Sequence, residues 1–197
     1  MPGPIVGILA LQGAFAKHAE MLQQLGIEVR EIRHPEQLAQ CDALVIPGGE
    51  STTIMRLIDF AKLYEPLQTF ASQNPVFGTC AGLILMSNEI LKDTMVPFKW
   101  LDVAVERNAY GRQIESFISD VDLIISNRTQ KFPATFIRAP RICQIGPDVQ
   151  VLAKLKEEPV LVRQGGFLGS TFHPELSADP SIHRYFLKMI SNWKPTC

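Results

Sequence analysis

The first half of the chain alternates short apolar segments with helical ones, and this alternation constrains the fold more than any other feature. Strands are predicted for the apolar runs 5–10, 43–46 and 76–77 and for the alternating run 27–32. Helices are predicted between and after these strands, over 14–25, 35–40, 51–60 and onward to about 72. This order predicts an α/β fold with parallel strands and helices on both faces of the sheet.

The second half of the chain is dominated by short strand signals separated by turns. The expected strands are 101–106, 112–118, 134–138, 149–155, 160–164 and 167–172, with turns at 108–111 and 164–166 and a last helix over 180–193. We expect antiparallel strands that extend the parallel sheet. The chain is therefore predicted to form a doubly wound, flavodoxin-like mixed sheet in one domain, residues 1–197, because no repeat or linker divides it.

Composition and charge exclude several classes of partner. The 197 residues are 46% hydrophobic and 20% charged, as in an ordinary globular protein. A net charge of −1 provides no electrostatic attraction for nucleic acid or an anionic membrane. The first residues lack the basic region of a signal peptide, and no apolar run reaches membrane-spanning length. We expect a cytoplasmic protein.

The four cysteines are scattered along the chain, at Cys41, Cys80, Cys143 and Cys197. They have neither the close spacing nor the neighbouring histidines of a zinc site, and they do not form the dense pattern of a disulfide framework. We therefore expect neither a metal nor disulfides.

Cys80 lies at the centre of the sequence Gly78-Thr79-Cys80-Ala81-Gly82, between an apolar run at 75–77 and a helical run predicted at 83–91. A tight strand-to-helix turn exposes such a side chain, and small flanking residues allow the close backbone approach that the turn needs. The following helix directs N–H groups and its positive end at the sulfur. A free cysteine is more often a small buried hydrophobic residue, but the two glycines favour a nucleophile.

A second reactive segment follows near the end of the chain, at His173-Pro174-Glu175. Proline favours an extended backbone at His173, and residues two apart on an extended chain face the same side. The Glu175 carboxylate is then expected to accept a hydrogen bond from the imidazole, which makes His173 a suitable base for Cys80. Singly, a structural histidine and a solvated carboxylate are the simpler interpretations. The remaining histidines, His18, His34 and His183, have no comparable neighbour in the sequence.

Three strand ends carry unusual residues, at 11–13, 48–51 and 78–80. We expect them to meet in one crevice, because ligands of such sheets bind at the carboxyl ends of the strands. Two nucleotide-binding interpretations fail. The segment 165–171 lacks the lysine of a phosphate loop and precedes a strand, and Gly7 and Gly13 do not complete a dinucleotide-binding motif.

Together, the Cys80 turn and the sequence FHPE at 172–175 resemble the class I (triad) glutamine amidotransferases. Four more segments resemble the glutaminase subunits of pyridoxal 5'-phosphate synthase (the PdxT/SNO family): ALQG at 10–13, PGGESTT at 47–53, ERNAYGRQ at 106–113 and FIRAP at 136–140. The resemblance covers nearly the whole chain. It implies the class I glutamine amidotransferase fold.

The resemblance also implies a reaction and a partner. Such subunits hydrolyse L-glutamine to glutamate and pass ammonia to a separate synthase subunit, which makes pyridoxal 5'-phosphate from ribose 5-phosphate and glyceraldehyde 3-phosphate. Cys80 would attack the carboxamide to form a thioester, His173 would transfer protons and Glu175 would orient His173. No cofactor is expected. A cysteine peptidase or redox-protective protein on a related fold, and a non-catalytic metabolite sensor, are the alternatives.

The glutamine contacts implied by the resemblance are Gly48, Gly49, Glu50, Arg107, Ile137 and Arg138. Arginine suits the α-carboxylate of glutamine, although surface salt bridges are the simpler interpretation of both arginines. Backbone N–H groups near Gly49 and Ala81 would form the oxyanion hole. Gln12 is left outside the catalytic set, with an exposed turn as its simpler interpretation.

Overall fold

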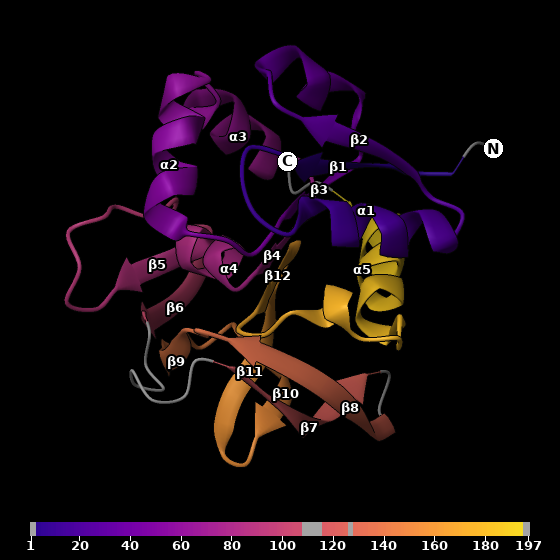
Figure 1. Cartoon of the computed structure of the whole chain (residues 1–197), viewed down its shortest axis with the longest axis vertical. Helices are drawn as coiled ribbons and strands as arrows, with labels where there is room; N and C mark the ends of the chain where they lie inside the picture. Colours follow the sequence, from indigo (N-terminus) through magenta and orange to yellow (C-terminus); the bar gives the residue numbers. More distant parts are fainter. Residues whose placement is uncertain (1–2, 108–115, 126–127, 195–197) are drawn as a thin grey trace.

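The computed structural model describes residues 3–107, 116–125 and 128–194. Its largest feature is a mixed sheet with the strand order β2-β1-β3-β4-β12-β11-β10-β7-β8 (Figure 1). Neighbouring strands run parallel from β2 as far as β12, and antiparallel beyond it. The mixed, doubly wound α/β fold expected from the sequence is therefore confirmed.

The parallel part of the sheet contains the strands predicted in the first half of the chain: β1 (Ile5–Leu9), β2 (Glu28–Ile32), β3 (Ala43–Ile46) and β4 (Val76–Thr79). Every residue of β3 and β4 is buried, because these strands are central and covered on both faces. The β4 strand continues two residues beyond the predicted segment, which brings it directly to Cys80.

Helices cover both faces of the parallel strands (Figure 1). One face packs against α1 (Phe15–Gln24) and α5 (Ser181–Asn192), and the other against η1 (Pro35–Gln40), α2 (Ser51–Phe60), α3 (Tyr64–Ala71) and α4 (Ala81–Met86). Alternation along the strands divides the core in two. Val45 and Phe77 pack on the α1 and α5 side, whereas Leu44 and Ile46 pack on the other.

The antiparallel part begins with β12 (Phe167–Ser170), which pairs with β4, and continues through β11 (Glu158–Gln164), β10 (Gln150–Leu155), β7 (Ser116–Ile125) and β8 (Arg128–Ile137). The β7–β8 hairpin is longer than the predicted strands 112–118 and 134–138. Many of its side chains are exposed, and the edge strand β8 carries Lys131 and Pro133, so its hydrophobic signal is weak. The turn predicted at 108–111 and residues 112–115 lie outside the described residues.

The helix predicted over 83–91 is wrong in its second half. Helix α4 ends at Met86, and β5 (Ser87–Ile90) pairs with β6 (Leu101–Glu106), which also pairs with β9 (Arg141–Ile145) in a second, three-stranded sheet. The Leu85 and Met86 carbonyls accept hydrogen bonds from Phe98 and Trp100 instead of continuing the helix. Strand pairing therefore overrides a helical hydrophobic pattern.

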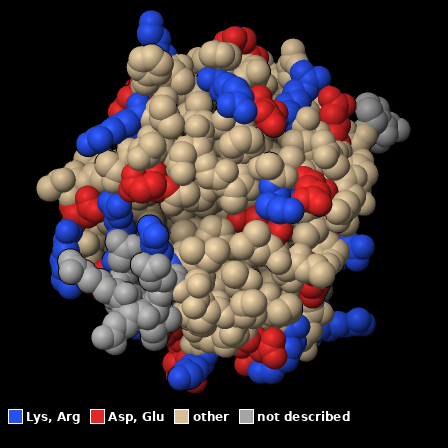
Figure 2. All heavy atoms as spheres, in the orientation of Figure 1, with Lys and Arg blue, Asp and Glu red and all other residues tan. Residues whose placement is uncertain are grey.

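Charges of both signs are interspersed over the surface seen in Figure 2, in keeping with the net charge of −1. Within the described ranges, each helix is too short or too polar to cross a bilayer.

Candidate active site

Cys80 occupies the tight turn between β4 and α4. Its backbone has φ 49° and ψ −102°, a conformation that side-chain-bearing residues rarely adopt. A Cβ on Gly82 would collide with the Ile46 carbonyl, and one on Gly78 would lie 2.6 Å from the Gly82 carbonyl carbon. The two flanking glycines are therefore needed for close backbone approach, as the sequence predicted. Helix α4 has only six residues, so its dipole is short.

His173 follows β12, the strand that lies beside β4. The Cys80 N–H donates to the Ser170 carbonyl at 2.8 Å, which joins the two strand ends. The His173 N–H donates to the Thr135 carbonyl at 2.8 Å and fixes the backbone on its other side. Cysteine and histidine are thereby brought together although they are distant in sequence.

Glu175 contacts His173 as predicted, but by a different local structure. Its Oε1 lies 2.7 Å from Nδ1 of His173. The expected extended segment is instead a 3-10 turn, η2 (Pro174–Leu176), that begins immediately after His173. Proline at the first helical position favours such a turn, and the turn directs the carboxylate back to the ring.

The charges of the triad stabilise one another. Burial would lower the pKa of His173, but hydrogen bonds with Cys80 and Glu175 raise it to about 10. Burial would raise the pKa of Glu175, but the nearby rings of His18 and His173 lower it. His173 therefore holds a proton at neutral pH opposite an ionised Glu175, which suits it to protonate a leaving group.

One cavity opens beside Cys80 and His173. It is lined by Cys80 and His173 together with the backbone or side chains of Gln12, Gly13, Ala14, Gly48, Gly49, Glu50, Ser51, Ile84, Arg107, Ile137 and Arg138. The three strand ends at 11–13, 48–51 and 78–80 do meet here, through Gln12, Gly49 and Cys80. Gln12 has a structural contact that the sequence did not reveal, since its Oε1 accepts the N–H of Glu50 at 2.9 Å.

Glu50 and Arg107 form an ion-paired cluster at this cavity. Glu50 caps α2 by accepting the N–H groups of Thr52 and Thr53. Burial would raise the pKa of Glu50, but hydrogen bonds from Thr53 and Thr52 lower it to about 2. Arg107 lies 3.1 Å from Glu50 and 2.8 Å from Asp93, so two carboxylates already hold its guanidinium in place.

His18 and His183 have no comparable neighbour in the sequence, but the fold brings polar residues from distant segments against them. Both side chains are fully buried, His18 on α1 and His183 on α5, and Nε2 of His18 lies 3.3 Å from Oε2 of Glu175. Helical periodicity was the available signal: His18 shares the apolar face of Met21 and Leu22, three and four residues onward. A histidine on a buried face needs polar partners, and these are at the triad.

Cys41 differs from Cys80 in its surroundings. Burial raises the pKa of the Cys41 thiol to about 11, which keeps it protonated and unreactive at neutral pH. Cys41, Cys80 and Cys143 are free thiols, and Cys197 lies outside the described residues. Within the described ranges, no group of three or more His, Cys, Asp or Glu side chains is arranged to hold a metal.

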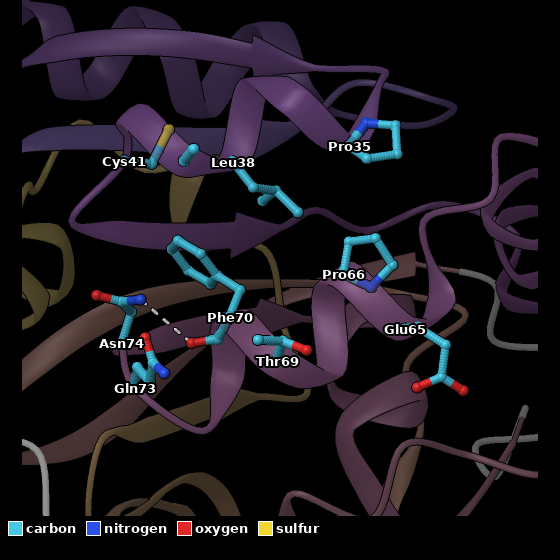
Figure 3. Close-up of a pocket in the computed structure, with 10 residues that line it drawn as sticks. Pro35, Leu38, Cys41, Glu65, Pro66, Thr69, Phe70, Gln73 and Asn74 are labelled. Atoms are coloured by element: carbon cyan, nitrogen blue, oxygen red, sulfur yellow. Dashed lines mark hydrogen bonds between the residues drawn. The ribbon is translucent and has the colours of Figure 1, made fainter.

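A second pocket lies between η1 and α3 (Figure 3). Leu38, Pro66 and Phe70 give it an apolar lining, and Cys41 is at one end. It includes none of the predicted catalytic or substrate-binding residues, so the reactive groups belong to the cavity at Cys80.

Comparison with known proteins agrees with this geometry. Residues 8–192 match the SNO glutamine amidotransferase family. The chain belongs to this family. A protein of Francisella philomiragia named pyridoxal 5'-phosphate synthase subunit PdxT is 47% identical over 184 residues, 93% of this chain and 98% of the relative. A protein of the same name from Pelotomaculum thermopropionicum is 50% identical over 184 residues, 93% of each chain.

Solved structures place this glutamine amidotransferase among proteins of the same fold. A crystal structure of a glutamine amidotransferase is 45% identical and superposes with a TM-score of 0.88, covering 94% of this chain and 98% of that chain. The structure of PurLQS from Thermotoga maritima has 16% identity and a TM-score of 0.68, with 98% of this chain and 97% of that chain covered. The latter similarity concerns the fold alone.

Proposed function

We propose that this glutamine amidotransferase hydrolyses L-glutamine through Cys80, His173 and Glu175 and delivers the ammonia to the synthase subunit of pyridoxal 5'-phosphate synthase. One observation carries the proposal: a strained cysteine and a histidine paired with a buried carboxylate line one cavity. The names of the relatives, each a pyridoxal 5'-phosphate synthase subunit, supply the partner. A cytoplasmic location belongs to the same proposal.

The reaction proceeds in two displacements. His173 holds the proton taken from the Cys80 thiol when the sulfur forms a bond to the carboxamide carbon of glutamine, and this proton moves to the departing nitrogen as the C–N bond breaks. Ammonia leaves, and a glutamyl thioester remains. Water then attacks the thioester carbon as His173 removes its proton, the C–S bond breaks and the sulfur is released with glutamate.

The oxyanion of each tetrahedral intermediate is assigned to the backbone N–H groups of Gly49 and Ala81. Gly49 lines the cavity, and Ala81 directly follows the nucleophile at the start of α4. Such donors stabilise charge that develops only in the transition state, and loss of one typically costs about 10²–10³-fold in rate. The closely packed Gly48 and Gly49 bring this loop near Cys80.

The two ends of the substrate need different partners. Arg138 is exposed at the cavity and is assigned to the α-carboxylate, for which guanidinium geometry is suited. Glu50, held ionised and paired with Arg107, is placed to attract the α-ammonium, while Arg107 provides positive charge at the same rim. Ile137, Gly48 and Gly49 contribute the remaining wall.

The test is Cys80→Ala, assayed for glutamine hydrolysis with the synthase subunit present. We expect loss of turnover by at least about 10³-fold, since the nucleophile is removed, with an unchanged melting temperature. Cys41→Ala is the matched control and should retain turnover. Full activity of Cys80→Ala would contradict the assignment of the triad.

A second measurement identifies the substrate. Labelled glutamine should be trapped on Cys80 as an acid-stable thioester adduct after quenching, whereas casein should remain intact. Casein cleavage without a glutamyl adduct would support the cysteine peptidase alternative instead. Synthesis of pyridoxal 5'-phosphate should require this chain with glutamine and proceed without it when ammonia is supplied.

A further inference from the structure

Two histidines that take no part in the proposed mechanism form a buried chain behind Glu175. Nδ1 of His18 lies 3.0 Å from Nε2 of His183, and Nε2 of His18 lies 3.1 Å from Oγ1 of Thr79. The same Nε2 is 3.3 Å from Oε2 of Glu175, the carboxylate oxygen that faces away from His173. These contacts connect α5, α1, the end of β4 and η2.

The contacts determine which ring nitrogens carry protons. A lone pair on Nε2 of His18 would repel the carboxylate at 3.3 Å, so this nitrogen must be an N–H. In a neutral ring Nδ1 is then an acceptor, and the proton in the contact with His183 lies on Nε2 of His183. One pair of tautomers therefore satisfies all three contacts.

Both rings are held neutral. Burial penalises the charged form of each ring: it lowers the pKa of His18, and it lowers the pKa of His183 to about 3. The groups facing His18 are Thr79 and the edge of Phe77 from β4, Glu175 from η2 and His183 from α5. Glu175 is the charged group among these contacts. Because Nε2 of His18 carries the proton on the side of Glu175, the positive end of the dipole of His18 lies toward this carboxylate.

The outer oxygen of Glu175 needs such a donor. Oε2 is buried, and no hydrogen bond of full geometry reaches it from the described residues, although the backbone N–H of Glu175 bonds to the carboxyl group; Nε2 of His18 is a close polar contact of Oε2, at 3.3 Å. A buried carboxylate oxygen without a donor is costly, and the carboxylate would rotate to find another. Rotation would remove Oε1 from its position 2.7 Å from His173.

We propose that His18 is a positioning residue for catalysis: its Nε2–H, which contacts Thr79 and lies 3.3 Å from Oε2 of Glu175, holds the Glu175 carboxylate in the orientation that places Oε1 against His173, and His183 fixes the tautomer of His18. The inference rests on the proposed function for its effect on turnover. Its geometric part concerns only how Glu175 is held against His173.

The experiment compares His18→Leu with His18→Gln and with Leu22→Ala, a core change on the same helix that leaves the triad untouched. Leucine removes the donor, whereas the glutamine amide supplies an N–H at similar reach. With the synthase subunit present, we expect His18→Leu to lower kcat about tenfold with KM for glutamine unchanged, as is typical when an orienting partner is lost. His18→Gln should recover most of this loss.

A second readout does not depend on turnover. The Nδ1 proton of His173, bound to Glu175, should give a low-field NMR resonance that is assigned by its loss in His173→Gln. This resonance should shift or broaden in His18→Leu and persist in His18→Gln and Leu22→Ala. His183→Phe, which frees the tautomer of His18, should give a smaller loss of kcat than His18→Leu.

The outcomes separate the inference from the proposed function. If His18→Leu keeps both kcat and the resonance, or loses no more than an equally destabilised Leu22→Ala, His18 is a core residue and the inference is overturned. Should His18→Leu fail to fold, His183→Phe decides by the same two measurements. If the wild-type protein with its synthase shows no glutaminase activity, the proposed function fails, while the resonance still reports on His18.

Discussion

The two sides of the triad differ in what surrounds them. On the cavity side, Cys80 and His173 face a space bounded by glycines, an ion pair and exposed arginine. On the buried side, Oε2 of Glu175 lies 3.3 Å from the uncharged ring of His18, which in turn contacts His183 and the hydroxyl of Thr79. The cavity side presents charged groups to a substrate. The buried side fixes the position of the Glu175 carboxylate through the dipoles of neutral side chains.

This difference explains why one histidine is basic and two are not. His173 lies between a thiol and a carboxylate, and its pKa is raised to about 10. His183 is buried deeper behind the same carboxylate, and its pKa is lowered to about 3. Complete burial outweighs the attraction of Glu175 at His18 and His183, whereas hydrogen bonds with Cys80 and Glu175 outweigh burial at His173.

The largest effect is expected where the two sides join, at Glu175. Glu175→Gln removes the charge that stabilises protonated His173 and gives its tautomer no fixed partner. We expect kcat with the synthase subunit present to fall about 10⁴-fold, comparable to the loss of the orienting carboxylate in other triads. The exposed Glu20→Gln on α1 is the control, and a loss below tenfold at Glu175 would show that His173 needs no carboxylate.

A smaller effect is expected from crowding the cavity side. A Cβ on Gly48 would collide with Cε1 of His173 and lie 3.3 Å from Cβ of Cys80. Gly48→Ala should therefore displace the ring and lower kcat about 10²-fold, because a misplacement near 1 Å has this cost. Gly3→Ala, where no atom lies within 4 Å, should leave kcat unchanged. Unaltered turnover in Gly48→Ala would mean that this loop moves away from His173 on its own.

The last difference between the two sides is in how each contributes to the pH dependence of stability. His183 has a pKa lowered from 6.5 to about 3, so the unfolded chain binds the additional proton and stability is lost as pH falls from 6.5 toward 3. His173 has a pKa raised to about 10, so its contribution is complete below pH 6.5 and is lost as pH rises toward 10.

Urea denaturation across these ranges measures both slopes, each at most about 1.4 kcal/mol per pH unit for one proton. His183→Phe should flatten the acid slope and leave the alkaline one, and His173→Gln should do the reverse. Equal flattening of both slopes by either variant would show that the two sides titrate as one unit.

The sequence predicts the cavity side well and the buried side poorly. Cys80 and His173 lie in short local motifs, and each follows a strand that the sequence predicts, β4 and β12. His18 and His183 lie on ordinary amphipathic helices, and their contact depends on α1 and α5 packing on one face of the sheet. Such a contact between distant segments leaves no local pattern in a single sequence.

Two errors in the fold have the same origin. The end of α4 depends on pairing of Ser87–Ile90 with a strand that comes later in the chain, and this pairing competes with a helical hydrophobic pattern. The β8 strand is polar and lies at the sheet edge, where pairing with β7 on one side sustains it without a continuous apolar run. Hydrogen bonds between distant segments determine both the end of α4 and the length of β8, and the local sequence does not reveal these bonds.

The pairing of β4 with β12 joins segments separated by almost half of the chain. Contacts of this kind form late in folding, because the intervening chain must first be confined. During synthesis, Cys80 emerges long before His173, so a growing chain has the nucleophile before its proton donor and before the strand β12 that pairs with β4. Ammonia release therefore requires synthesis of the chain through His173. Truncated chains that lack the last strand and helix are expected to be inactive.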